Sequence, residues 1–399
     1  MLFRSLRGWL PPPYPLLGSL FGGVQFGVWS YWGNSYWGGA VAAAGGALVA
    51  GAIPRLAAGP NGTAAFLAAV GAIILANTRP YEGFIFAATS ALMLAYWRRS
   101  RRVDLRSLLS ARTVFPVAIV LCGGFLWMAY YNHRVTGHYW LMPYVLNERA
   151  YAQNPEWWVL PPGPIPEYRH QVIRTFWSLW RTQYEADRYH PLEILKHFQQ
   201  MLRFFLPVPL LILTVISIVI YPSRKARIAL GILGVLSLSM LLEAAVFPHY
   251  YAPATALLLF LILGVVRLII RVLIRYGSAL DFAVAAGLIV LLIAIGAKTV
   301  ERVSQPRVPF PADRYQILDM LQKTRMRHLV IVRYSAEHNV HEEWVYNQAN
   351  IDQSAVVWAR DMDEASNREL LDYYRDRQIW LFEPDAHPRQ LKKYNSRWQ

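Results

Sequence analysis

Long apolar segments constrain this chain more than any other feature of its sequence. Residues 251–273 (YAPATALLLFLILGVVRLIIRVL) and 280–298 are each long and apolar enough to cross the ~30 Å hydrocarbon core of a bilayer. Charged side chains make up 16% of the 399 residues, whereas soluble proteins carry about 25%. We therefore expect a mainly α, polytopic membrane protein.

The apolar segments divide the chain into four regions. Five spans are expected in residues 1–131, an outward-facing loop at 132–203, four spans in 204–299, and a small soluble α/β domain at 300–399. The nine expected spans are residues 15–32, 38–54, 63–78, 82–97, 114–131, 204–221, 228–246, 251–273 and 280–298.

The distribution of charge predicts how these spans are oriented. With the N-terminus inside, fifteen Arg and Lys side chains fall on the inner loops, while basic and acidic residues nearly balance in the tail. This is the positive-inside pattern, and it explains the net charge of +15 without nucleic acid as a partner. We expect a multi-pass protein of the cytoplasmic (inner) membrane, in contact with membrane lipids, with its C-terminal domain outside, in the periplasm of a two-membrane host.

The start of the chain has a second interpretation. Arg4 and Arg7 precede an apolar run, as in a signal peptide. The run is interrupted by Pro11-Pro12-Pro13, and no small-residue cleavage site follows it. A retained helix is therefore favoured.

The outward loop contains two amphipathic segments. Residues 167–185 place apolar side chains at helical spacing, and residues 192–205 do the same after His190-Pro191. These helices are expected to lie in the interface plane and to cover a cavity. The alternative is that they only pack on the spans below.

The tail alternates short apolar strands with helices. Helices are expected at 312–326, 340–348 and 364–376, and strands at 328–334, 355–361 and 378–384. This order predicts a small parallel sheet in two or three layers. No glycine-rich phosphate loop follows a strand, so nucleotide binding has no support. The domain is expected to cover the membrane site or to bind a protein partner.

The sharpest candidate for chemistry is the segment Thr78-Arg79-Pro80-Tyr81-Glu82-Gly83. Pro80 ends one helix and the next begins at once, so Arg79 and Glu82 are expected at a tight turn at the membrane surface. The planar fork of an arginine binds phosphate oxygens in a bidentate way. Arg79, with Tyr81 beside it, is therefore predicted to bind a lipid phosphate. The alternative is an Arg79–Glu82 ion pair that caps the turn.

A second group of candidates lies at the loop 247–253 (FPHYYAP). His249 and Tyr250 interrupt an apolar stretch and are predicted to position a donor or acceptor; an interfacial aromatic belt is the alternative. Glu243 is expected about one turn inside the seventh span. An acid there is costly and indicates function, with Arg79 or His249 as its partner, although it could equally reach the surface.

Metal ligands and nucleophiles are thinly represented. His338 and His341 share an i, i+3 spacing, and His133 and His138 flank a turn, but neither pair is a recognised ligand set and solvated histidines are the commoner outcome. The single cysteine, Cys122, excludes an internal disulfide. The residues themselves predict neither a metal nor a cofactor.

Taken together, these motifs resemble the later two-thirds of a bacterial GT-C glycosyltransferase. This superfamily includes protein O-mannosyltransferases and lipid A aminoarabinose transferases. The similarity rests on residues 34–56 (NSYWGGAVAAAGGALVAGAIPRL), 69–83 (AVGAIILANTRPYEG) and 247–253, and it covers about residues 15–300. The resemblance implies transfer of a sugar from a lipid-linked phosphate donor, a polyprenyl phosphate, to an acceptor on the outer face. In the family a divalent metal can take part, for which this sequence shows no ligand set.

One family feature is missing from the chain. Members of the superfamily carry an acidic residue in the first outward loop, where it acts as base or metal ligand. The corresponding loop here, residues 29–39 (WSYWGNSYWGG), has neither Asp nor Glu. Two explanations stay open: the sequence is shortened at its N-terminus, or it has lost the catalytic acid.

The leading hypothesis is a membrane glycosyltransferase in which Arg79, aided by Arg181 or Arg188 from the outward loop, stabilises the leaving phosphate. Glu82 or Glu243 would act as the base. The alternative is a non-catalytic membrane subunit whose residues 300–399 bind a partner. A transporter is less favoured, because the sequence has no internal repeat.

Overall fold

The computed structural model describes residues 1–28, 30–33, 35–205, 223–276 and 310–394, which form two compact units. The helical unit contains the described residues within 1–147, 155–161 and 186–304. The sheet unit contains those within 148–154, 162–185 and 305–399. Part of the segment between the fifth and sixth expected spans thus belongs with the C-terminal tail.

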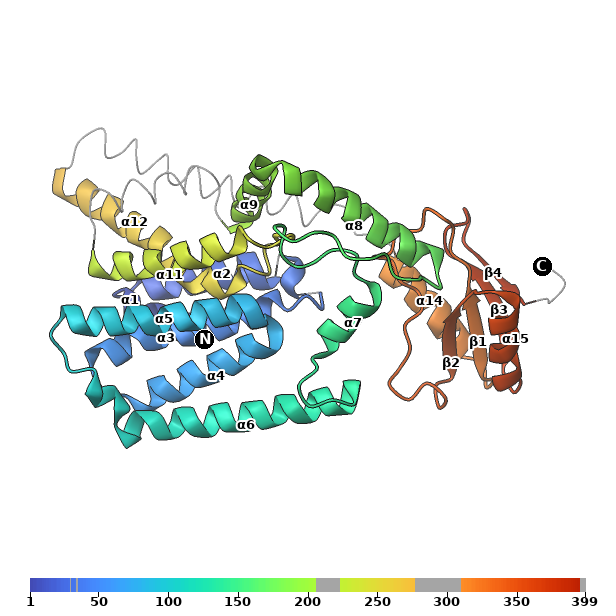
Figure 1. Cartoon of the computed structure of the whole chain (residues 1–399), viewed down its shortest axis with the longest axis horizontal. Coiled ribbons are helices and arrows are strands. Elements are labelled where there is room, and N and C mark those ends of the chain that lie inside the picture. The colour runs from blue at the N-terminus through green and yellow to red at the C-terminus, as the bar shows by residue number, and fades with distance from the viewer. Residues whose placement is uncertain (29, 34, 206–222, 277–309, 395–399) are drawn as a thin grey trace. The chain divides into compact units, whose positions relative to one another are not determined.

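Helices packed side by side make up the helical unit. α3 (Gly39–Ala58) contacts both α4 (Gly62–Thr78) and α5 (Pro80–Ser100), and α6 (Ala111–Thr136) contacts α4 (Figure 1). α11 (Arg224–Met240) contacts α5, and α12 (Thr255–Tyr276) contacts α3. Small residues on α3 permit this close approach, as expected for helices that pack without large side chains between them.

The closest approach is at Gly46 of α3. A Cβ added there would lie 2.1 Å from the carbonyl oxygen of Pro253 in η4 (Ala252–Ala254), the 3₁₀ turn before α12. No side chain fits in that space, so α3 and η4 touch backbone to backbone.

Three helices of the described residues are long and apolar enough to cross a membrane: α3, α6, and Ala252–Arg271, which joins η4 to α12. The expectation of nine spans is therefore not confirmed. α4 and α11 have 17 residues each, and α5 carries charged residues at both ends. The expected spans 204–221 and 280–298 lie almost entirely or entirely outside the described residues.

The first expected span is not one continuous α-helix. After α1 (Leu2–Trp9), α2 runs from Tyr14 to Gly22 and continues as a π-helix, η1 (Gly23–Val28), with a short 3₁₀ turn, η2 (Tyr31–Gly33), beyond it. Prolines 11–13 have no N–H to donate and separate α1 from α2. Repeated glycines weaken the helix that follows.

Besides α6, four helical elements lie between α5 and α11 in the described residues. They are η3 (Arg106–Leu109), α7 (Pro143–Tyr151), α8 (Gln171–Tyr189) and α9 (Pro191–Phe205). α8 and α9 confirm the two predicted amphipathic helices, whereas the sequence did not predict α7. In the helical unit, Met201 and Phe205 of α9 pack into the apolar core.

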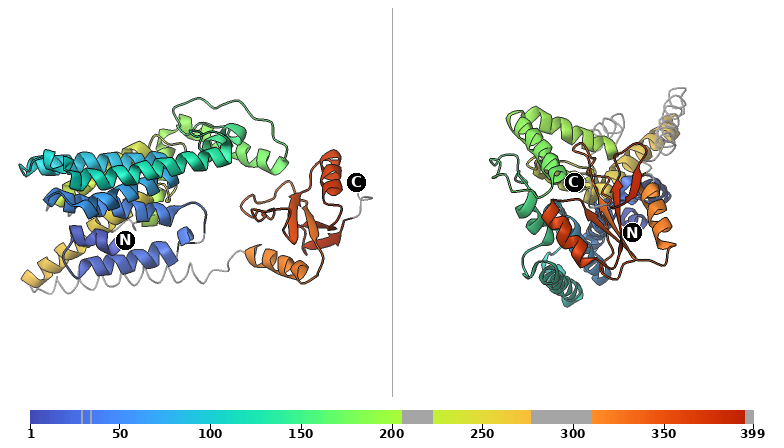
Figure 2. Two further views of the ribbon diagram at one scale, coloured as in Figure 1. Left: turned by 90° about the horizontal axis from the view of Figure 1, so that it is seen from below. Right: turned by 90° about the vertical axis from the view of Figure 1, so that its right-hand side faces the viewer.

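The sheet unit contains a four-stranded sheet in the order β2-β1-β3-β4. Its elements are α14 (Phe310–Gln322), β1 (His328–Val332), β2 (Val356–Arg360), α15 (Glu364–Tyr373), β3 (Gln378–Glu383) and β4 (Gln390–Lys393). The first three strands are parallel, as predicted, and the polar β4 adds an antiparallel edge. α14 packs on one face and α15 on the other, which makes three layers (Figure 2).

The helix expected at 340–348 is wrong. Trp344 is fully buried against the sheet, and its N–H donates to the Tyr334 hydroxyl at 2.9 Å. The N–H of Val345 donates to the Glu343 carboxylate at 2.8 Å. Side-chain oxygens thus accept from the backbone N–H groups that a helix would pair with its own carbonyls. The local sequence pattern does not show that these side chains are close enough to do so.

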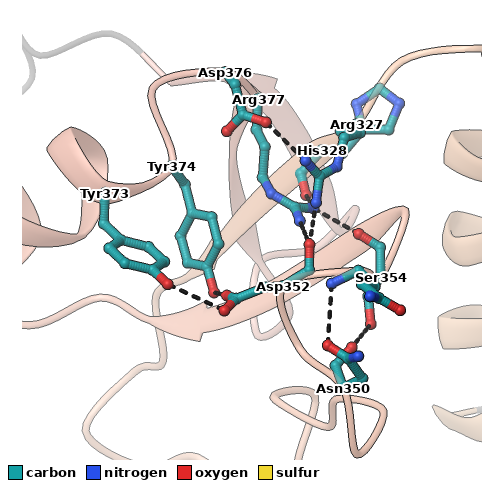
Figure 3. A network of polar contacts seen from close by, with 10 residues as sticks. Arg327, His328, Asn350, Asp352, Ser354, Tyr373, Tyr374, Asp376 and Arg377 are labelled. Atoms are coloured by element: carbon teal, nitrogen blue, oxygen red, sulfur yellow. Dashed lines mark hydrogen bonds and ion pairs between the residues drawn. The ribbon is translucent and has the colours of Figure 1, made fainter.

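A buried arginine joins the amino ends of the three parallel strands (Figure 3). Arg377, just before β3, donates to the carbonyl oxygens of Ser354 at 2.7 Å, Asp352 at 2.8 Å and His328 at 3.3 Å. The Asp352 carboxylate in turn accepts from the hydroxyls of Tyr374 at 2.8 Å and Tyr373 at 3.0 Å. This network fixes the loop before β2 to the amino ends of β1 and β3.

Candidate functional site

Arg79 is the single residue between α4 and α5. Its N–H donates to the Leu75 carbonyl at 2.7 Å, which completes α4, and its carbonyl accepts from the Gly83 N–H at 2.8 Å, which starts α5. Pro80 occupies the first turn of α5, as the sequence predicted. Two helices therefore fix the backbone of Arg79.

The Arg79 side chain is held but not fully paired. Its guanidinium lies over the ring of Tyr250, with 4.1 Å between Cζ and the ring centroid, and Nη2 donates to the Trp37 carbonyl at 2.9 Å. The Nε atom is buried and has no hydrogen-bond partner among the described residues. Glu82 is within electrostatic reach, but the described contacts include no Arg79–Glu82 ion pair, so the capping alternative loses its basis.

Glu243 lies beyond the end of α11, and its expected place inside a span is wrong. The helix stops at Met240, and the following backbone pairs with the segment 155–161: the Ala244 N–H donates to the Glu156 carbonyl at 2.7 Å, and the Trp158 N–H to the Leu242 carbonyl at 3.3 Å. This pairing satisfies backbone groups that another helical turn would have used.

Glu243 and Glu82 are both buried, with 8% and 5% of their surfaces exposed. Oε1 of Glu243 has no hydrogen-bond partner in the described part of the chain. Both carboxyls interact electrostatically with Arg79 and with Glu156. One arginine and three acids thus share this end of the bundle.

His249 is enclosed by aromatic side chains. Its Nδ1 is 2.9 Å from the Tyr31 hydroxyl, and its ring centroid lies 5.0 Å from that of Trp37 and 5.5 Å from that of Phe247. Burial, and secondly the Arg79 charge, lowers the pKa of His249 to about 3. His249 is therefore neutral and adds no positive charge to the site.

The two predicted tyrosines line the same region. The hydroxyl of Tyr81 is 3.4 Å from the Ser239 carbonyl, and its ring meets that of Trp157 edge-on at 4.6 Å. Burial raises the pKa of Tyr250, which lies beneath the Arg79 guanidinium. We call Arg79, Tyr81, Glu82, Glu243, His249 and Tyr250 the Arg79 cluster.

The other two predicted arginines interact with residues near them in the sequence. Arg181 lies in the sheet unit, where it pairs with Glu185 at 2.9 Å and donates to the Gly163 carbonyl at 2.9 Å. The Arg188 guanidinium lies 5.9 Å from the ring centroid of its neighbour Tyr189. Both have local partners.

The candidate histidine pairs are also used locally. His338 Nδ1 is 2.8 Å from the Asp385 carboxylate, while His341 packs edge-on against Phe176. His133 stacks on Tyr139 at 4.3 Å. Within the described ranges, no three His, Cys, Asp or Glu side chains are placed to hold a metal ion.

The chain matches no protein-family model, no curated protein and no solved structure. The chemistry that the chain can perform therefore depends on the Arg79 cluster. That cluster offers a fixed cation, two buried carboxyls and an aromatic wall, which together suit a ligand with a phosphate and a hydroxyl.

Sequence reasoning missed three members of the site. Trp37 supplies the carbonyl that holds Arg79, Tyr31 contacts His249, and Glu156 adds a third acid. The density of aromatics in residues 29–39 was a usable signal for the first two. Nothing local marked Glu156, because its place depends on backbone pairing with residues 242–244.

Proposed function

We propose that this chain is an integral membrane glycosyltransferase of GT-C type. It transfers a sugar from a polyprenyl-phosphate donor to an acceptor on the outer face of the cytoplasmic membrane. The observation that carries the proposal is the pair of buried, unpartnered atoms Arg79 Nε and Glu243 Oε1. Each such atom costs about 1–3 kcal/mol when left unpaired. A ligand that brings both a phosphate oxygen and a hydroxyl would recover that energy.

Arg79 is suited to bind the donor phosphate. Its Nη2 is anchored on the Trp37 carbonyl and its flat face lies on Tyr250, so the orientation of the guanidinium is set before a ligand arrives. The Nε–H remains for a phosphate oxygen. Because His249 is neutral, Arg79 supplies the positive charge among the six cluster residues.

The reaction requires one proton transfer and one displacement. In its ionised form, which burial disfavours by raising the pKa of both carboxyls, Glu243 or Glu82 takes the proton from the acceptor hydroxyl. The hydroxyl oxygen attacks the anomeric carbon, and the bond between that carbon and the phosphate oxygen breaks. The electron pair stays on the lipid phosphate, whose charge Arg79 stabilises.

The divalent metal implied by the resemblance does not fit the residues described. Glu82, Glu156 and Glu243 interact through space, but they do not converge as a ligand set. We therefore assign no step of the reaction to a metal.

Binding of undecaprenyl phosphate, the product common to such donors, tests the proposal. Arg79→Gln in the full chain should weaken binding by about 10- to 150-fold, the value of a charged hydrogen bond of about 1.5–3 kcal/mol. Arg99→Gln is the matched control, because Arg99 is exposed near the other end of α5. Wild-type affinity in Arg79→Gln would refute the phosphate assignment.

The non-catalytic alternative is favoured by one observation, the absence of an acid from residues 29–39. It predicts a stoichiometric protein partner that is lost when residues 300–399 are deleted. It also predicts that Glu243→Gln has no effect on any sugar transfer measured with the full chain. Loss of transfer in Glu243→Gln, with undecaprenyl phosphate still bound, would reject this alternative.

A further inference from the structure

We propose that the carboxyl end of α6, with the turn and the start of α7 that follow it, is embedded in the membrane–water interface of the outer leaflet. Six aromatic side chains of the helical unit lie there, each with between 44% and 89% of its surface exposed: Trp127, Tyr130, Tyr131, Tyr139, Trp140 and Tyr144. We call them the α6 aromatic patch. The inference rests on the membrane placement proposed above and is independent of the transfer reaction.

α6 lies along one side of the helical unit, where it packs on α4 (Figure 1). Only 11% of its apolar stretch is buried, and Phe115, Ile119 and Leu126 are exposed along its length. Arg112 in its first turn and Tyr131 near its carboxyl end are separated by about 28 Å along the helix axis. This is close to the ~30 Å thickness of the hydrocarbon core. If Arg112 lies at one face of the bilayer, Tyr131 therefore lies at the other.

The side chains at the carboxyl end of α6 suit the level of the lipid head groups. Trp and Tyr favour that level because their rings are apolar while the indole N–H and the phenol hydroxyl stay in contact with water. Trp127, Tyr130, Tyr131 and the exposed Arg134 follow i, i+3, i+4, i+7 spacing, so they share one face of α6. Residues 105–147 contain no Asp or Glu, so no acidic side chain of this segment repels a lipid phosphate.

The turn after α6 is held by its own contacts. Gly137 has a φ of +78° at the end of the helix. The buried Asn132 donates from Nδ2 to the Tyr139 carbonyl at 3.2 Å, and the rings of His133 and Tyr139 stack with 4.3 Å between their centroids. Tyr139 and the adjoining Trp140, which is 89% exposed, are thus fixed beside the last turns of α6. Because the α6 aromatic patch continues a helix whose apolar side chains face outwards, its partner is the bilayer.

Nitroxide labels on the full chain in proteoliposomes test the depth of the α6 aromatic patch. Cys122→Ser removes the single cysteine, and His138→Cys or Tyr144→Cys then supplies one exposed labelling site. Collision of the label with oxygen, which concentrates in lipid, and with nickel ethylenediamine diacetate, which stays in water, gives its depth. Both labels should lie about 15–22 Å from the bilayer centre, the range of the head groups.

Two exposed residues supply the control labels, Ile119→Cys for the hydrocarbon core and Tyr346→Cys in the sheet unit for water. If the nickel reagent reaches the labels at His138→Cys and Tyr144→Cys as readily as the label at Tyr346→Cys, the α6 aromatic patch faces water and the proposal is overturned. Poor access of both oxygen and nickel would also overturn it, because a protein surface would then cover the patch.

Substitution of Trp140 tests whether the α6 aromatic patch anchors the turn. With the label at Tyr144→Cys, Trp140→Asp should move the label from the head-group range towards water, because a carboxylate disfavours the interface. Trp140→Tyr keeps an interfacial aromatic and should leave the depth unchanged. An unchanged depth in Trp140→Asp would overturn the anchoring role. These substitutions lie outside the Arg79 cluster, so undecaprenyl phosphate binding should be unchanged, and failure here is distinct from failure of the transferase proposal.

Discussion

Arg377 is predicted to hold the parallel sheet together at its amino edge, and Arg377→Met tests this. The methionine keeps an unbranched apolar stem of similar reach but removes every donor. The carbonyls of Ser354 and Asp352 lose bonds of 2.7 and 2.8 Å, and that of His328 loses a longer one of 3.3 Å. Two charged hydrogen bonds are worth about 3–6 kcal/mol in total. Part of that is returned because a buried cation no longer has to be desolvated.

We therefore expect a net loss of about 3 kcal/mol in the sheet unit, which is a factor of roughly a hundred in the opening equilibrium. Hydrogen exchange measured by mass spectrometry on the full chain reports this directly, through peptides that cover β1, β2 and β3. Protection in all three strands should fall together, because Arg377 contacts the chain next to each of them. Arg377→Lys, with a single ammonium, should give an intermediate loss.

The matched control is Arg375→Met. Arg375 lies two residues away and is exposed, so its substitution should leave exchange unchanged. Wild-type protection of the three strands in Arg377→Met would refute the argument. Loss confined to β3, where Arg377 is attached, would refute the claim that it bridges the strands.

Three further outcomes follow from the helical unit. Cys122 is exposed on α6, so in intact membranes it should react with a permeant maleimide and resist a charged one; equal labelling by both would contradict a lipid-facing α6. Gly46→Ala should lower the melting temperature by an amount equivalent to about 1–3 kcal/mol, because its Cβ meets the Pro253 carbonyl, while Gly234→Ala, with open space around it, should not. For His249, whose folded pKa is about 3 through burial and the Arg79 charge, the unfolded chain takes up the proton first as the pH falls below about 6.5. The contribution of neutral His249 to the free energy of unfolding is therefore present above that pH and is lost towards pH 3. If the stability of a His249→Gln variant fell with pH in the same way as that of the wild type, this assignment to His249 would be wrong.

Much of the local structure could be predicted from the sequence, because prolines and short apolar runs determine it within a few residues. Pro80 correctly predicted the turn at Arg79. Short apolar runs separated by helical segments predicted the three parallel strands to within two residues. β4 was missed because its residues (QLKK) are polar and it forms by pairing with β3. The helix that became α11 was predicted to extend too far, because apolar residues continue past Met240. There the backbone of residues 242–244 pairs with residues 156–158 instead of continuing the helix.

In the candidate site, too, local signals identified some residues correctly and others not. Arg79 and Tyr250 were singled out separately by their prolines and by their interruption of apolar runs, and the structure places one over the other. Arg181 was predicted by charge alone, and its charge is used by Glu185 four residues along its own helix. A charge count cannot distinguish an arginine aimed at a ligand from one that pairs locally; the distinction depends on which residues the fold brings near.

The one-residue connection between α4 and α5 has a consequence for the evolution of this chain. Each residue of an α-helix advances about 100° around its axis, so a single insertion between Thr78 and Pro80 would carry Arg79 away from both Tyr250 and the Trp37 carbonyl. Lineages that keep the site can therefore exchange residues along α4 and α5 but cannot change the spacing at this junction. The link between α5 and α6, residues 101–110, is longer, and the buried Arg98 holds it through the Asp104 carbonyl and the Ser107 hydroxyl rather than through its length alone. Among descendants of this sequence, we expect insertions and deletions to be absent at Arg79.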